Sequence, residues 1–117
     1  MKYNYTLYRD HLGSLRIRLP EHIDMFSDFI GLIATEEEVN EYLQIIDAVK
    51  NGKHKPFQIL LDAPMVTIKP KFTSVTLSEI LDDPPPDQYI ETDQFRELIL
   101  IWKEKLPERF LEIDKED

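Results

Sequence analysis

The sequence predicts an α+β domain in which an antiparallel β-sheet of about five strands is covered on one face by two amphipathic helices. Two observations predict this class. Apolar residues alternate with polar ones in residues 3–19 and 57–77, as in strands with one buried face. In residues 36–51 and 93–106 they recur every three or four positions, as in helices with one buried stripe. Strands that follow one another closely favour antiparallel pairing, and the length predicts a single domain over residues 1–117.

Residues 3–19 are predicted to form a β-hairpin. Leu15 and Ile17 alternate with polar neighbours in the second strand. Gly13 is able to take the positive φ that a tight turn requires. Pro20 ends the hairpin because proline has no N–H to donate to a strand ladder.

Residues 23–33 are predicted to form a third strand, bulged near Gly31. Met25, Ser27 and Phe29 fall on one face of such a strand. A short helix is the alternative, because the apolar residues of this segment fit neither period fully.

Residues 36–51 are predicted to form a helix. Thr35 and Glu38 have the spacing of a capping box, in which two free N–H groups of the first turn are satisfied. Gly52 marks the end of the helix. The expected buried stripe consists of Val39, Tyr42, Leu43, Ile46 and Val49.

Residues 57–77 predict two or three further strands, because a turn at Pro64 and the break at Pro70 divide the segment. The next segment, 78–91, is predicted to be a long connection. Its proline triplet, residues 84–86, holds the chain extended.

The second predicted helix covers residues 93–106, with Thr92 as its N-cap. Pro107 ends it. Residues 108–117 are expected to be a charged tail.

The negative charge lies mainly in the last third of the chain. Residues 1–77 contain 10 acidic and 9 basic side chains, a net charge of −1, whereas residues 78–117 contain 13 acidic and 5 basic, a net charge of −8. The total of −9 opposes binding to phosphate and predicts no direct nucleic-acid partner. A field of one sign concentrated in one region instead attracts a cationic partner.

The sequence contains no recognisable catalytic motif. It has no cysteine, and its three glycines are too few to build a phosphate-binding loop. His11, His22 and His54 lie in predicted loops without the spacing of a metal site. We therefore expect a protein that is not an enzyme and that has no cofactor and no bound metal.

No targeting segment or membrane span is visible in the sequence. The longest apolar stretch near a terminus, residues 98–102, is far shorter than the roughly 20 residues of a membrane-spanning helix. The absence of cysteine favours a reducing compartment. We expect a soluble, cytoplasmic protein without a membrane partner.

The predicted binding site is the acidic connection and the residues that follow it. Exposed carboxylates steer a basic partner, and a tyrosine beside them is a suitable anchor in an interface. The candidate residues are Asp82, Asp83, Asp87, Tyr89, Glu91 and Asp93.

Residues 5–18 (Tyr-Thr-Leu-Tyr-Arg-Asp-His-Leu-Gly-Ser-Leu-Arg-Ile-Arg) resemble the opening hairpin of the YacL family of small bacterial proteins. The later elements follow in a similar order: a helix that ends in Asp-Ala-Val-Lys-Asn-Gly, a two-stranded stretch, an acidic link and an apolar helix. This resemblance implies a housekeeping adaptor or interaction protein without a toxin partner, and no established activity.

In size, charge and lack of catalytic motifs the chain also resembles the immunity proteins of bacterial contact-dependent growth inhibition systems. This resemblance implies a non-catalytic cytoplasmic protein that binds a cognate toxin domain, a basic nuclease, and blocks its active site or substrate-binding site. It assigns no role to any single residue.

Overall fold

The computed structural model describes residues 1–77 and 82–109. Within these residues the chain forms three α-helices, two short 3₁₀-helices and six strands, which belong to two antiparallel sheets of two and four strands. The α+β class predicted from the sequence is therefore confirmed. The elements, in chain order, are β1 (Thr6–Arg9), β2 (Leu15–Arg18), η1 (Glu21–Ile23), α1 (Met25–Gly31), α2 (Glu36–Lys50), β3 (Phe57–Leu60), β4 (Met65–Ile68), β5 (Phe72–Thr76), β6 (Gln88–Glu91), α3 (Thr92–Lys105) and η2 (Leu106–Glu108).

The predicted hairpin is present as β1 and β2, with Leu7 opposite Ile17. Asp10 orders the turn, because its carboxylate accepts hydrogen bonds from the amides of Leu12 at 2.9 Å and Ser14 at 3.0 Å. Gly13 has a φ of 83°, as the turn required. The hairpin forms a sheet of its own and packs against α1 instead of extending the larger sheet.

The prediction of a third strand over residues 23–33 is wrong. This segment forms η1 and α1, so the helical alternative holds. Ile23, Phe26, Ile30 and Ile33 are all fully buried. They follow one another at intervals of three or four residues, which is the helical period. Other buried residues lie between them on a second side of the helix, and these obscured the period in the sequence.

The predicted helix over residues 36–51 is confirmed as α2. The Thr35 hydroxyl accepts a hydrogen bond from the Glu38 amide at 3.2 Å, as expected of an N-cap. Glu38 accepts a bond from the amide of Ala34, one residue before the N-cap position expected for a capping box. The helix buries Val39, Tyr42, Ile46 and Val49.

The larger sheet has the strand order β3-β4-β5-β6, with each strand antiparallel to its neighbours. The strands predicted in residues 57–77 correspond to β3, β4 and β5. The connection predicted over residues 78–91 is shorter than expected, because its last four residues form β6, in which Ile90 pairs with Thr73 of β5. Four residues after a proline triplet are too few to show a period, so β6 was missed. Residues 78–81 of this connection lie outside the described residues.

The second predicted helix is confirmed as α3, but Thr92 is not its N-cap. The helix begins at Thr92, and Glu91 holds the N-cap position. Thr92 is fully buried, where its hydroxyl donates to the Lys69 carbonyl and lies 2.9 Å from the Thr73 hydroxyl. A threonine at a helix start therefore joins α3 to the sheet here. Of the predicted charged tail, residues 110–117 lie outside the described residues.

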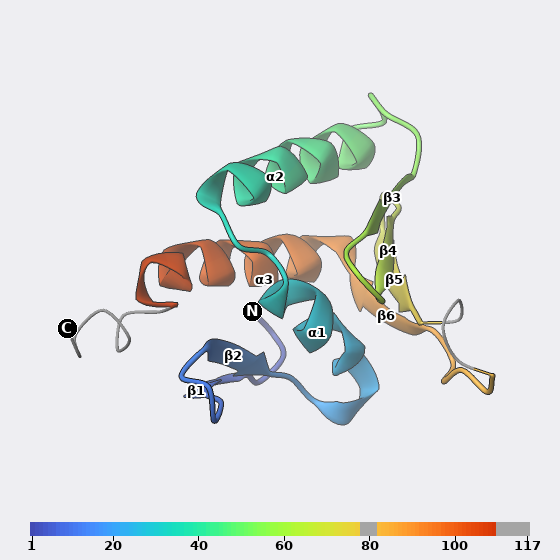
Figure 1. Cartoon of the computed structure of the whole chain (residues 1–117). Helices are drawn as coiled ribbons and strands as arrows, with labels where there is room; N and C mark the ends of the chain where they lie inside the picture. Colours follow the sequence, from blue (N-terminus) through green and yellow to red (C-terminus); the bar gives the residue numbers. More distant parts are fainter. Residues whose placement is uncertain (78–81, 110–117) are drawn as a thin grey trace.

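The helices all lie on one side of the four-stranded sheet (Figure 1). The core between these layers contains Phe26, Phe29, Phe95 and Trp102, none of which is exposed. The Trp102 indole Nε1 donates a hydrogen bond to the carbonyl of Ile33 at 3.0 Å. No described element covers the opposite side of the sheet, and the loops that join its strands are gathered at its two ends.

Candidate functional site

Two connections meet at one end of the four-stranded sheet. The β3–β4 turn carries Asp62, and the connection that enters β6 carries Asp82, Asp83 and Asp87. All four side chains are exposed. Asp62 has a φ of 56°, a left-handed conformation that aspartate tolerates better than most residues. The antiparallel meander thus places carboxylates that are far apart in sequence at a single edge.

Gln88, the first residue of β6, attaches η1 and α1 to this edge. Its side-chain oxygen accepts a hydrogen bond from the Met25 amide at 2.7 Å, which satisfies a free N–H group at the start of α1. Its nitrogen donates to Asp24 Oδ1 at 3.0 Å and to the Glu21 carbonyl at 3.3 Å. Two further exposed carboxylates, those of Glu21 and Asp24, are thereby held beside the residues that precede β6.

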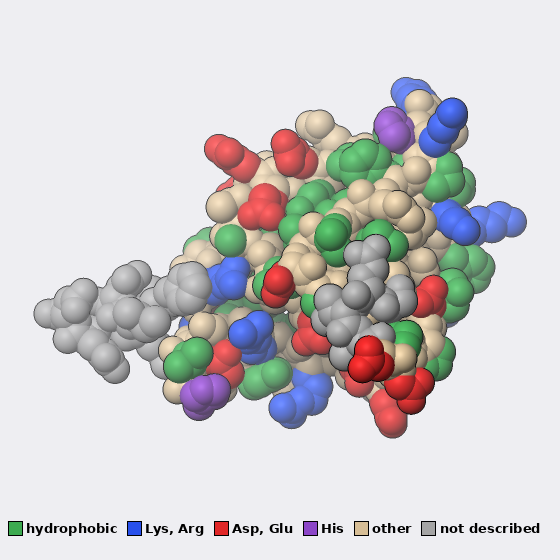
Figure 2. All heavy atoms as spheres, turned by 45° about the vertical axis from the view of Figure 1, so that its right-hand side comes forward, with side chains coloured by type: hydrophobic (Ala, Val, Ile, Leu, Met, Phe, Trp, Pro, Cys, Tyr) green, Lys and Arg blue, Asp and Glu red, His purple; other side chains and the backbone are tan. Residues whose placement is uncertain are grey.

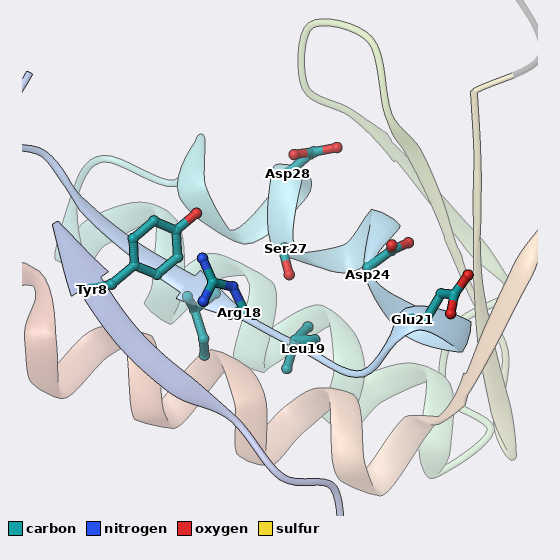
Figure 3. A pocket seen from close by; sticks show the side chains of 8 residues that line it. Tyr8, Arg18, Leu19, Glu21, Asp24, Ser27 and Asp28 are labelled. Carbon is teal, nitrogen blue, oxygen red and sulfur yellow. The ribbon is translucent and has the colours of Figure 1, made fainter. Parts of the chain in front are cut away.

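A pocket of about 470 Å³ lies between the hairpin and α1. Figure 3 shows its side chains: Tyr8 and Arg18 come from the hairpin, Glu21 and Asp24 from η1 and its C-cap, and Ser27 and Asp28 from α1. The Arg18 guanidinium lies over the Tyr8 ring, 4.5 Å from its centre. The Ser27 hydroxyl is buried and has no hydrogen-bond partner among the described residues.

Asp28 connects this pocket to a second one. The second pocket, of about 390 Å³, is lined by Asp28, Asp62 and Leu77 among others. Desolvation by surrounding atoms raises the pKa of Asp28, and the charge of Asp24 raises it further, whereas Arg16 opposes the rise. We call the whole surface the acidic end, and it consists of Glu21, Asp24, Asp28, Asp62, Asp82, Asp83 and Asp87.

The structure divides the site residues predicted from the sequence into two groups. Asp82, Asp83 and Asp87 belong to the acidic end, and none of them forms an ion pair with another described residue. Tyr89 is 59% exposed and follows them on β6. Figure 2 shows a group of acidic side chains at the lower right of the molecule.

Glu91 and Asp93 lie at the opposite end of β6 and are bound by the chain itself. Glu91 forms an ion pair with Lys2 and accepts a hydrogen bond from the Tyr3 hydroxyl. The bond from Lys2, followed by that from Tyr3, lowers the pKa of Glu91 to about 2. Asp93 forms an ion pair with Lys50. These two carboxylates are therefore compensated locally.

Sequence reasoning missed Glu21, Asp24, Asp28 and Asp62. They come from the near-neutral first part of the chain, where the local composition gives no sign of an acidic surface. Only the pairing of β6 with β5 and the contacts of Gln88 place them beside the later acids. The four lysines between residues 53 and 71 lie at the other end of the sheet.

Among residues 1–77 and 82–109, no group of three or more His, Asp or Glu side chains is placed to hold a metal ion. None of the helices in the described part of the chain combines the length and apolar character needed to cross a membrane. A comparison with known protein families, curated proteins and solved structures finds no match for this chain. The resemblances drawn from the sequence therefore stay predictions.

Proposed function

We propose that this chain is a non-catalytic immunity protein that neutralises a cognate toxin in the cytoplasm. Its acidic end binds a basic toxin domain, a nuclease, over the groove that receives the nucleic-acid substrate. The observation that supports this proposal is the gathering of seven carboxylates from separate segments of the chain at one end of the fold.

Carboxylates without an ion pair to a described residue are most concentrated at the acidic end, whereas others, such as Glu41 and Glu104, are scattered over the helices. Asp93 and Glu108 form ion pairs with lysines of the same chain. Asp82, Asp83 and Asp87 form none with described residues, so their field extends into solvent. Complementary charge accelerates encounter with a cationic surface and fixes its orientation.

Charge alone does not give high affinity, because most binding energy in an interface comes from a few buried anchors. Tyr89 meets that requirement: it is 59% exposed and lies two residues after Asp87. In the proposed complex, Tyr89 packs into an apolar hollow of the toxin while the acidic end covers the residues that bind phosphate.

The proposal is tested with the product of the neighbouring gene in the native host. That product is expected to be toxic when expressed alone, to be tolerated when this chain is co-expressed, and to co-purify with it. If the neighbouring gene product is not toxic and does not bind this chain, the proposal is contradicted. That result favours the alternative function, a housekeeping adaptor or interaction protein without a toxin partner.

Matched charge reversals locate the site on this chain. Asp83→Lys with Asp87→Lys is expected to weaken binding by about 10- to 100-fold and to reduce its salt dependence. Glu41→Lys with Glu104→Lys changes the net charge equally, on exposed helix positions away from the acidic end, and is expected to have less than about a threefold effect. An equal loss of toxin binding in the two double variants would show that binding depends only on the net charge of this chain.

A further inference from the structure

The side of the four-stranded sheet that faces away from the helices carries large exposed apolar side chains. Strand alternation buries Ile59, Val66, Val75 and Ile90 on the inner face. We call the other side the outer face; it consists of Gln58, Leu60, Met65, Thr67, Phe72, Ser74, Thr76, Tyr89 and Glu91. The carboxylate of Glu91, which is paired with Phe72 in the register, is compensated by Lys2. Leu60 is 55% exposed, Phe72 54% and Tyr89 59%. A hollow of about 370 Å³ lies between Lys69, Phe72, Ser74 and Tyr89.

Charges of opposite sign flank the outer face along the strand direction. The loop before β3 carries Lys53 and Lys55, and the β4–β5 turn carries Lys69 and Lys71. These four exposed lysines form the basic end of the sheet, opposite Asp62, Asp82, Asp83 and Asp87. None of the eight forms an ion pair with another described residue. Figure 2 shows Lys and Arg side chains above and acidic side chains below, with hydrophobic side chains between them at the right.

We propose that a second copy of this chain packs against the outer face, related by a two-fold axis that lies in the interface and runs across the strands. Two different two-fold axes in the plane of the interface can bring the outer faces of two copies together, one along the strands and one across them. An axis along the strands places acidic end on acidic end, which is repulsive. An axis across the strands places the four lysines of each copy over the four aspartates of the other, so the charges select this arrangement.

The axis predicts which residues meet. The central row of the outer face runs Gln58, Thr67, Ser74, Tyr89 through the paired strands. Residues of this row lie near the axis and face their own counterparts, so Tyr89 faces Tyr89 of the second copy. Phe72, near the basic end, faces the row of Leu60, Met65 and Thr76. Apolar side chains are thereby covered on both copies.

The size of the face sets the strength of the association. Four strands about 4.8 Å apart, four or five residues long at about 3.3 Å each, give a footprint on the order of 300 Å². A stable dimer buries about 800 Å² per copy. The association is therefore expected to be reversible and weaker than that of a stable dimer. It does not depend on the proposed toxin partner, which binds the acidic end more tightly and displaces the second copy.

Analytical ultracentrifugation of the purified full chain at 0.15 M salt tests the proposal. Between 10 μM and 1 mM, the weight-average mass is expected to rise from 13.9 kDa towards twice that value. Phe72→Ser is expected to weaken the association at least tenfold, whereas Leu12→Ser, which removes a 68% exposed side chain in the hairpin turn, leaves it unchanged. A constant mass of 13.9 kDa up to 1 mM overturns the proposal and leaves the outer face to a different partner.

A charge swap tests the direction of the axis. Lys69→Asp with Lys71→Asp, and separately Asp82→Lys with Asp83→Lys, are each expected to weaken association about tenfold. All four changes together restore opposite charges across the interface, so association is expected to return to within about threefold of the original. Failure of the combined variant to recover, with its fold intact by circular dichroism, overturns the proposed axis.

Cross-linking provides a second test, because the chain contains no cysteine. Tyr89→Cys treated with a short bismaleimide is expected to form a covalent dimer, since this residue faces its own counterpart. Leu12→Cys serves as the control for random collision. Equal cross-linking of the two variants contradicts the arrangement. Because no toxin is present in any of these measurements, their failure is distinguishable from failure of the proposed function.

Discussion

Gln88 accepts a hydrogen bond from the Met25 amide at 2.7 Å, although the two residues lie 63 positions apart. Its side-chain nitrogen donates at the same time to Asp24. A single amide therefore caps a helix, joins that helix to a strand of the sheet and keeps two acidic segments together. Asp24 does not cap α1 with its own side chain.

Replacement of Gln88 by alanine is expected to lower the free energy of unfolding by about 1–2 kcal/mol, because the α1 amide loses its acceptor. Urea denaturation measures the change. Gln58→Ala is the matched control, since Gln58 is an exposed glutamine on β3 without a side-chain hydrogen bond to a described residue. It is expected to change stability by less than about 0.5 kcal/mol. Equal changes in the free energy of unfolding for Gln88→Ala and Gln58→Ala would mean that the Gln88 hydrogen bonds do not stabilise the fold.

Trp102→Phe removes the hydrogen bond to the Ile33 carbonyl and leaves unfilled volume in the core. The expected loss is about 2 kcal/mol or more, from the bond and the cavity together. Thermal or urea unfolding followed by circular dichroism measures it, since the variant lacks the tryptophan signal. Leu100→Ala, at a 39% exposed position of the same helix, is expected to lose far less. Similar losses would argue against a buried indole.

Thr35→Ala is expected to destabilise the protein by about 1 kcal/mol, because the Glu38 amide loses the hydroxyl that caps α2. Thr35→Ser keeps an acceptor at the same place and is expected to stay close to the wild type. Chemical denaturation of the three proteins side by side provides the comparison. A serine variant as unstable as the alanine variant would show that the methyl group, and not the hydroxyl, matters.

Glu91 predicts a pH dependence of stability. Its pKa is lowered from 4.5 to about 2 in the folded protein. The ionised carboxylate therefore stabilises the fold above pH 4.5, and this contribution is lost as the pH falls from about 4.5 to 2. The stability difference between the wild type and Glu91→Gln is expected to be largest near neutral pH and to shrink over that interval. Unfolding titrations across the interval measure it.

The control for this titration is Glu104→Gln. Glu104 is exposed and forms no ion pair with a described residue. Its replacement is expected to change the free energy of unfolding by less than about 0.5 kcal/mol. A Glu91→Gln difference that does not change with pH would contradict the role assigned to Lys2 and Tyr3.

The elements that could be predicted from the sequence have one buried side. In α2 the buried residues form one stripe, and Thr35 marks its start. By contrast, α1 is buried on more than one side, so its apolar residues do not show a single period. In the same way, β6 is too short to show alternation and is recognisable only by its pairing with β5.

The candidate site was partly predictable for a related reason. Asp82, Asp83 and Asp87 are close in sequence, so the local charge identified them. Glu21, Asp24 and Asp28 were not identified, because nearby bases such as Arg16 and Arg18 balance them in sequence. Net charge along the chain does not show which charges meet in space. Lys2 and Glu91 show the converse case, since a lysine that is distant in sequence compensates a carboxylate that the sequence predicts as part of the site.

The hairpin at the start of the fold depends on residues near its end. The Arg9 guanidinium donates to the carbonyl of Arg109 at 2.9 Å, 100 positions away, and the Leu15 amide bonds to the same carbonyl. During synthesis this hairpin therefore forms its last bonds only after residue 109 has left the ribosome. Contacts of such long sequence separation slow folding. The nascent chain consequently exposes apolar surface for longer than a fold that closes from one end to the other.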